Sequence, residues 1–148
     1  MGLFDNFSSV RTANNTDLSP AESFAGVMLA TIAADGYLAR EEISSLVTTL
    51  HQMKLFQSYP SESISRMIDK LMKMMQVQSV DRLLNISIKC LPEYLHETVF
   101  AVSTDLILSD GEVSEEEEAV LSKLCSSLSI SKDKVSKIIE VMIIKNKG

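Results

Sequence analysis

Two acidic turns contain the residues of this chain that are best suited to chemistry. The first is AADGYLAREE at residues 33–42, and the second is SDGEVSEEEE at residues 109–118. Carboxylate oxygens are the ligands that hard divalent cations such as calcium, magnesium and manganese prefer. The candidate ligands are therefore Asp35 and Glu42 in the first turn and Asp110 and Glu117 in the second.

Each turn is similar to the rear half of an EF-hand calcium loop. If the glycine is counted as loop position six, the aspartate falls at position five and Glu42 or Glu117 falls at position twelve, the bidentate ligand. The front half is missing, because positions one and three are Thr31 and Ala33 in the first copy and Leu106 and Leu108 in the second. A normal EF-hand is therefore excluded.

A purely structural interpretation of the same carboxylates also stands. Ser114 and Glu117 fit a capping box at the start of a helix, and an aspartate before a glycine accepts hydrogen bonds from the downstream backbone. Carboxylates in a first helical turn also face the positive end of the helix dipole. Only Glu117 of the four consecutive glutamates 115–118 fits the capping position, so the surplus charge leaves the cation interpretation open. A tight site requires the two turns to face each other.

The elements that position these turns are all predicted to be helices. Ser19-Pro20-Ala21-Glu22 is a capping box with proline at the first helical position, so a helix begins there and continues through the apolar stretch to residue 34. Apolar residues at three- and four-residue steps predict the remaining helices. Their approximate ranges are 40–55, 62–77, 80–90, 93–108, 115–128 and a last one that Ser131 caps. The sequence predicts a single all-α domain of about seven helices at residues 19–148, preceded by a flexible arm at 1–18.

An internal repeat relates the two acidic turns. Residues 24–50 align with residues 99–125, an offset of 75, and both copies show a buried helix, the pattern D-G-x-apolar-x-x-E-E, and an amphipathic helix. The alignment places Asp35 on Asp110 and Glu42 on Glu117. We therefore expect two related helical hairpins joined by the middle helices.

Composition excludes several classes of function. The net charge of −6 argues against a nucleic-acid partner, because phosphate binding needs a positive field. The most apolar run, residues 24–34, is too short to span a bilayer, which needs about 20 residues, and the N-terminus lacks the pattern of a signal peptide. We expect a soluble, cytoplasmic protein in which Cys90 and Cys125 are reduced and buried. His96 lies near glutamates and could serve as a base, but we expect an ordinary surface histidine.

The two turns, the MGLFDNF opening and the stretch LILSDGEVSEEEEAVLSKLCSSLSIS together resemble the TerB family of bacterial tellurite-resistance proteins. The resemblance implies an all-helical, cytoplasmic stress-response module. It also implies assembly with other stress-response proteins, with peripheral association at the membrane through those partners. The acidic residues that it implicates in a cation site are Asp35, Glu42, Asp110 and Glu117, with Glu41 and Glu116 as weaker members. Ala39-Arg40 departs from the acidic or hydroxyl pair that is common in the family.

Three functional hypotheses follow. The first is a non-enzymatic interaction module that a divalent cation tunes. The second is an enzyme, either a metal-assisted hydrolase with His51 or His96 as its base or a thiol-linked tellurite reductase that needs an exposed Cys90 or Cys125. The third is a structural homo-oligomer in which Phe4 and Phe7 of the arm dock on a neighbour.

Overall fold

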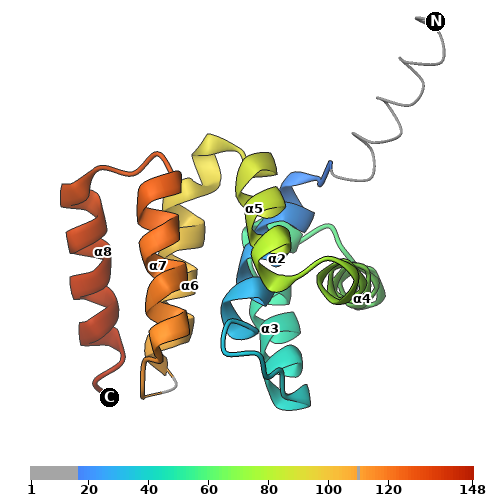
Figure 1. The fold of residues 1–148 in the computed structure, drawn as a ribbon, viewed down its shortest axis with the longest axis horizontal. Helices are drawn as coiled ribbons and strands as arrows, with labels where there is room; N and C mark the ends of the chain where they lie inside the picture. Colours follow the sequence, from blue (N-terminus) through green and yellow to red (C-terminus); the bar gives the residue numbers. More distant parts are fainter. Residues whose placement is uncertain (1–16, 110) are drawn as a thin grey trace, which may run out of the picture.

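Every regular element that the computed structural model describes, in residues 17–109 and 111–148, is helical (Figure 1). The α-helices are α2 (Pro20–Ile32), α3 (Arg40–Gln52), α4 (Ser61–Val77), α5 (Val80–Cys90), α6 (His96–Ser109), α7 (Glu115–Ser127) and α8 (Lys132–Lys145). Short 3-10 helices, Lys54–Phe56 and Glu93–Leu95, precede α4 and α6. The predicted all-α domain of about seven helices is confirmed. Most of the predicted arm, residues 1–16, and the candidate ligand Asp110 lie outside the described residues; Leu18 is buried in the core.

Helix α2 is the centre of the core. Its side chains from Ser23 to Ile32 are all buried, and α2 packs against α3, α4, α5, α6 and α7. Polar side chains within the core helices bond back to the preceding turn: Thr31 donates to the Val27 carbonyl at 2.8 Å and Thr104 donates to the Phe100 carbonyl at 2.8 Å. Because such hydroxyls are satisfied within their own helix, α2 can be enclosed by other helices on every side.

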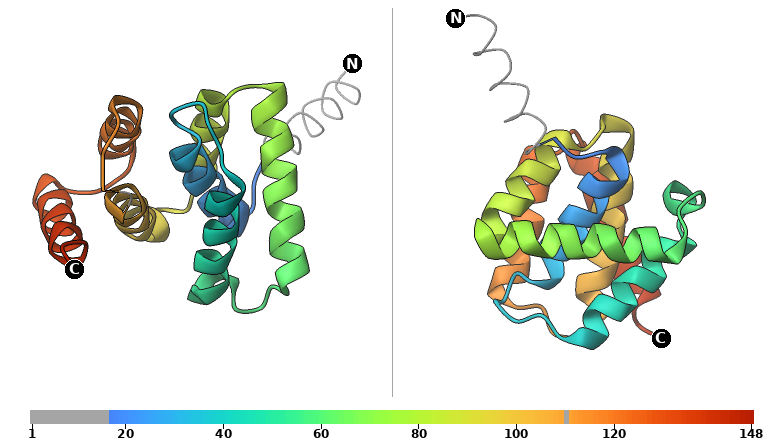
Figure 2. Two further views of the ribbon diagram at one scale, coloured as in Figure 1. Left: turned by 90° about the horizontal axis from the view of Figure 1, so that it is seen from below. Right: turned by 90° about the vertical axis from the view of Figure 1, so that its right-hand side faces the viewer.

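The two repeats meet along α2 and α6, which lie side by side and run in the same direction (Figures 1 and 2). Met28 and Ser103 occupy equivalent positions in the repeats, 75 residues apart, and the Ser103 hydroxyl donates to the Met28 sulfur at 3.5 Å. A contact between equivalent residues is what an approximate two-fold axis between the repeats produces. Because the helices are parallel, the acidic turns that follow them emerge at the same end of the domain.

The helices that follow the two repeats pack differently. After the first repeat, α4 contacts α2, α3 and α5, whereas α8, after the second repeat, packs mainly on α6. The predicted inward residues of α8 (Val135, Ile138, Ile139 and Met142) are half-buried, and no residue of α8 is fully buried. Helix α8 is therefore an edge helix.

Both glycines of the acidic turns adopt the left-handed conformation that ends a helix. Gly36 has φ of 85° and Gly111 has φ of 88°, and neither has an atom near its missing side chain. The requirement for glycine is thus conformational rather than steric. The predicted helix-ending turn is present in both repeats.

Helices α2 and α5 approach each other closely at Gly26. An added Cβ at Gly26 would overlap the Ser87 hydroxyl oxygen, which is buried and has no hydrogen-bond partner in the described part of the chain. We predict that Gly26→Ala lowers the free energy of unfolding by about 1–3 kcal/mol, because overpacking outweighs the gain of about 1 kcal/mol in helix propensity. Denaturant unfolding measures the loss. Ser87→Ala alone should be neutral or stabilising and should restore part of the loss in the double variant; a Gly26→Ala protein as stable as the wild type would contradict this packing.

An ion pair fastens α4 to the start of α2. Glu22 accepts from Lys70 at 2.6 Å and also completes the capping box of α2 through the Ser19 N–H. Partial burial opposes the charged form, but the Lys70 ammonium and the Ser19 bonds prevail and hold the pKa of Glu22 below its ordinary value of 4.5.

Because the folded pKa is depressed, the stability that Glu22 contributes is complete above the unfolded pKa and is lost as the pH falls through the folded pKa. We predict that Lys70→Met removes less than about 1 kcal/mol at neutral pH. It should also flatten the loss of unfolding free energy from pH 5 down to pH 3, as followed by denaturant unfolding at each pH. Lys73→Met on the same helix is the control, and equal pH profiles for both variants would refute the assignment.

Candidate functional site

The two acidic turns line one pocket. Its volume is about 300 Å³, and its lining comes from both repeats: Ile32, Asp35, Glu42, Glu112, Val113, Ser114 and Glu117. The structure thus brings together three of the four principal candidates, Asp35, Glu42 and Glu117. Asp110, the fourth, lies outside the described residues.

Each of the three carboxylates is held by a backbone N–H through one oxygen. Asp35 Oδ1 accepts from Tyr37 at 3.0 Å, Glu42 Oε1 accepts from Ala39 at 3.0 Å, and Glu117 Oε1 accepts from Ser114 at 2.9 Å. Ser114 returns the bond by accepting from the Glu117 N–H at 3.1 Å, so the predicted second capping box is present. The structural interpretation is correct for Glu117. It extends to Glu42, which accepts a hydrogen bond from the Ala39 N–H, although the alanine side chain cannot accept one in return.

The capping bonds leave the second oxygen of each carboxylate without a hydrogen bond to any residue in the described part of the chain. Glu42 and Glu117 are half-buried at the first turns of α3 and α7, whereas Asp35 and Glu112 are exposed. No lysine or arginine belongs to the pocket lining. Negative charge in the pocket is therefore offset by the N-terminal ends of α3 and α7 rather than by a basic side chain.

The carboxylates line one pocket but do not form a ready coordination shell. No group of three histidine, cysteine, aspartate or glutamate side chains among residues 17–109 and 111–148 has a geometry that could hold one metal ion. A cation in this pocket would therefore need water molecules between it and some of the carboxylates, or a rotation of their side chains. Either arrangement gives a weaker site than a preformed cage of protein oxygens.

The weaker candidates do not line the pocket, and one residue that does was missed. Glu41 is exposed on the outside of α3, and Glu116 lines a different cleft on the other side of α7. Glu112 lies in the pocket although its equivalent in the first repeat is Tyr37, so an alignment of the repeats gave no reason to choose it. Its position directly after the turn glycine was the available signal.

The expectation that His96 is a surface histidine is wrong. His96 is buried; its Nδ1 accepts from the Ser129 N–H at 2.9 Å, and its Nε2 lies 3.2 Å from the Leu91 carbonyl. Because Nδ1 accepts a hydrogen bond from a backbone N–H, the ring proton is on Nε2, which donates a hydrogen bond to the Leu91 carbonyl. His96 thus joins two loops that flank α6. Neither His96 nor the exposed His51 lines the acidic pocket.

The expectation that both cysteines are fully buried is also wrong, since both are half-buried. Cys90 Sγ accepts from the Leu18 N–H at 3.5 Å and lies 3.9 Å from Asp17 Oδ1, so it helps to attach the chain before α2 to α5. Burial raises the pKa of the Cys125 thiol above its ordinary value of 9.0. A raised pKa lowers the fraction of reactive thiolate at neutral pH.

Together the fold and the pocket define an all-helical domain of two parallel repeats that share an acidic pocket at one end. No helix in the described ranges is both long and apolar enough to cross a membrane. Comparisons of the chain with protein-family models, with curated proteins and with solved structures give no match.

Cys125 provides a test of the thiol chemistry. In a Cys90→Ser variant, we predict that the rate of labelling of Cys125 by a disulfide reagent rises with pH with a midpoint above 9.0, because burial disfavours the thiolate. The same variant unfolded in guanidinium is the control and should show a lower midpoint. A folded-state midpoint at or below the unfolded one would contradict the assignment and favour the reductase hypothesis.

Proposed function

We propose that the protein is a non-enzymatic, TerB-like interaction module that binds a divalent cation between its two acidic turns. One observation carries the cation part of the proposal: turns 75 residues apart in the sequence contribute Asp35, Glu42, Glu112 and Glu117 to one pocket. Capping alone requires each glutamate to serve its own helix and does not require the two turns to meet. Convergence of both turns is the condition under which their oxygens can act on one ion.

The composition of the pocket favours a hard cation. Every charged group in the lining is a carboxylate, and neither imidazole nor thiolate is among them. Calcium, magnesium and manganese suit such oxygen ligands, and calcium tolerates the irregular, partly hydrated coordination that this geometry offers. With one oxygen of Asp35, Glu42 and Glu117 committed to the backbone, the remaining oxygens supply few direct ligands. We therefore assign the site an affinity in the millimolar range of weak extracellular-type calcium modules, about 10⁻⁴–10⁻³ M.

Cation binding would act on the angle between the two hairpins. Glu42 belongs to the first turn of α3 and Glu117 to the first turn of α7, so an ion between them would draw the second helices of the repeats together. An interaction module whose surface includes α7 would thereby respond to the ion. The partners we propose are other stress-response proteins in the cytoplasm, as the TerB resemblance implies.

The enzymatic alternatives have less support from the site. A metal-assisted hydrolase needs a base beside the ion, and neither His51 nor His96 belongs to the pocket lining. A thiol-linked reductase needs an accessible thiolate, and the raised pKa of Cys125 works against it.

Calorimetric titration and thermal melting with calcium and manganese test the cation site. We predict binding heat and a rise in Tm of a few degrees at about 10 mM ion, which is about 10 to 100 times the assigned Kd, since binding to the native state alone then adds about 1.4–2.7 kcal/mol. Glu42→Gln/Glu117→Gln should abolish both effects. The amide oxygen of glutamine still accepts the capping hydrogen bond, so the double variant should fold.

Matched variants distinguish binding in the pocket from nonspecific attraction of cations to an acidic surface. Glu115→Gln/Glu118→Gln removes the same charge from the first turn of α7 outside the pocket and should bind the ion as the wild type does. Glu112→Gln should weaken binding. Absence of heat and of a Tm change in the wild type at millimolar ion would refute the proposal, and so would equal binding by both double variants.

A further inference from the structure

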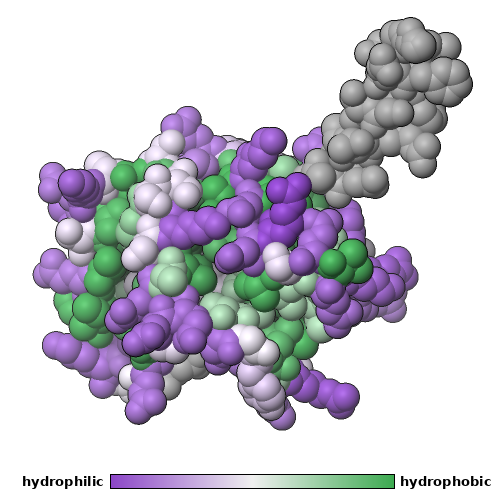
Figure 3. Space-filling model, in the orientation of Figure 1, coloured by the Kyte–Doolittle hydropathy of each residue, from purple (hydrophilic) through white to green (hydrophobic). Residues whose placement is uncertain are grey.

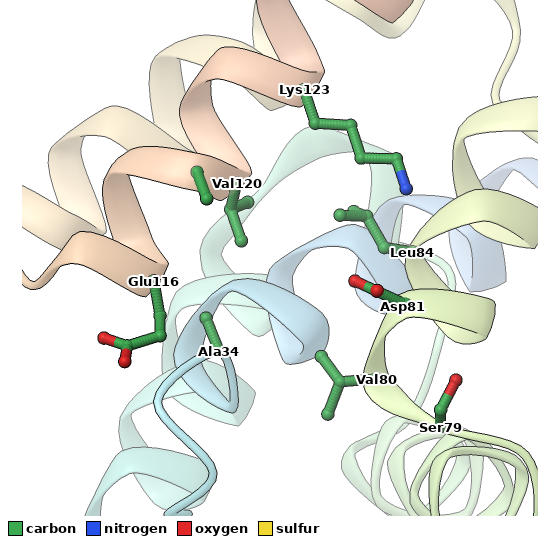
Figure 4. Close-up of a pocket in the computed structure, with 9 residues that line it drawn as sticks. Ala34, Ser79, Val80, Asp81, Leu84, Glu116, Val120 and Lys123 are labelled. Atoms are coloured by element: carbon green, nitrogen blue, oxygen red, sulfur yellow. The ribbon is translucent and has the colours of Figure 1, made fainter.

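A second cleft lies on the other side of α7, between α7, the end of α2 and the start of α5 (Figure 4). Its volume is about 570 Å³. Small and aliphatic side chains form its floor: Ala34, Val80, Leu84, Ala119 and Val120. Three charged residues flank this floor, Asp81 on α5 and Glu116 and Lys123 on α7, and none of them forms a salt bridge within the described part of the chain. The cleft is thus an apolar strip with unused charges at its rim.

Helix α8 carries a second apolar strip, on the face that points away from the rest of the molecule. Val141, Ile143 and Ile144 are 55%, 45% and 59% exposed, and hydrophobic residues are visible along the left edge of the molecule where α8 lies (Figure 3). On one flank of α8 a shallow groove of about 530 Å³ is lined by Ser136, Ile139, Glu140, Ile143, Ile144 and Lys147. Ile139 also packs against the core, whereas Glu140, Ile143, Ile144 and Lys147 do not. On the side of α8 that faces α6, Lys145 pairs with Asp105 at 3.2 Å. The strip therefore has no partner in the described chain.

The two strips share one pattern of spacing. In the cleft, α7 presents Glu116, Ala119, Val120 and Lys123. On the edge, α8 presents Glu140, Ile143 and Ile144, and the turn that follows α8 presents Lys147. Both read Glu, two apolar residues three and four positions later, and Lys at the seventh position. The seven steps from Glu116 to Lys123 cover about 10.5 Å of α7. In the second strip only Glu140, Ile143 and Ile144 are on the helix, and Lys147 is in the turn after it. When the two strips are laid antiparallel, each glutamate meets the other strip's lysine and the apolar pairs meet between them.

We propose that the α8 strip of one copy of this chain docks antiparallel against α7 in the cleft of a second copy. Glu140 then pairs with Lys123 and Lys147 pairs with Glu116, while Ile143 and Ile144 cover Val120 and Ala119. Asp81 on the opposite wall adds a further acceptor for the lysines of α8. The contact is heterologous, because the two surfaces are different, so each copy keeps one strip and one cleft for further neighbours.

The charge distribution of the chain supports this pairing. Residues 132–147 contain five lysines, one aspartate and one glutamate, a net charge of +3. Because the whole chain carries −6, the remainder carries −9. A positive edge helix and a negative body attract each other between copies, which favours encounter and fixes orientation. A symmetric α8–α8 dimer would also pair Glu140 with Lys147, but it would bring two positive helices together and leave the cleft open.

Sedimentation velocity in a chelating buffer at low salt tests the assembly independently of the cation site. The wild type should show a weight-average mass above 16.4 kDa that rises with protein concentration and returns to 16.4 kDa in about 1 M salt, where the Debye length is about 3 Å. Lys123→Glu and Glu140→Lys should each abolish the increase, because each places like charges opposite one another. The double variant Lys123→Glu/Glu140→Lys should restore it, and so should a mixture of the two single variants.

The control is Lys73→Glu on α4, an exposed site away from both strips, which should assemble as the wild type does. Circular dichroism and melting confirm that each variant folds, and Glu116→Lys/Lys147→Glu provides a second charge exchange. A wild type that stays at 16.4 kDa at every concentration would overturn the proposal. So would a response to Glu140→Lys but not to Lys123→Glu, since that result indicates the symmetric α8 dimer.

Discussion

The complete burial of α2 is the constraint on which the rest of the structure depends. A helix that is apolar on every side cannot lie on a surface, so α3, α4, α5, α6 and α7 must all pack against it. That many neighbours can approach only if the side chains between them are small at some points. Gly26 permits one such close approach, to Ser87, whose buried hydroxyl has no hydrogen-bond partner among the residues that the structure describes. The positions of these five helices follow from the burial of α2.

The acidic pocket is a consequence of that packing. Because α6 is the repeat counterpart of α2 and lies parallel to it, the turns after both helices emerge at one end and the first turns of α3 and α7 converge there. Each turn is locally complete, with its left-handed glycine and its capping glutamate satisfied. The local requirements explain why the carboxylates exist. Only the parallel arrangement of the repeats explains why Asp35, Glu42 and Glu117 share a pocket.

Local features were therefore predictable from the sequence, and relations between distant features were not. The capping boxes at Ser19 and Ser114 and both Asp-Gly turns depend on residues within four positions, so the sequence alone defines them. The burial of His96 depends on backbone groups at Leu91 and Ser129, of which Ser129 is 33 residues away, and no local pattern indicates it. Glu112 joins the pocket through tertiary position alone.

The two repeats have similar acidic turns, but the helices that follow them, α4 and α8, pack differently. The two proposals depend on these two features separately. The cation site uses what the repeats share, since it needs an equivalent carboxylate from each. The proposed contact between copies uses what they do not share. Helix α4 is enclosed by α2, α3 and α5, whereas α8 rests mainly on α6 and leaves isoleucines in water. An exposed aliphatic strip is unfavourable for an isolated molecule. The fold of a single copy gives the α8 strip no role. Its charges and spacing match those of the α7 cleft, so contact with a second copy would bury it.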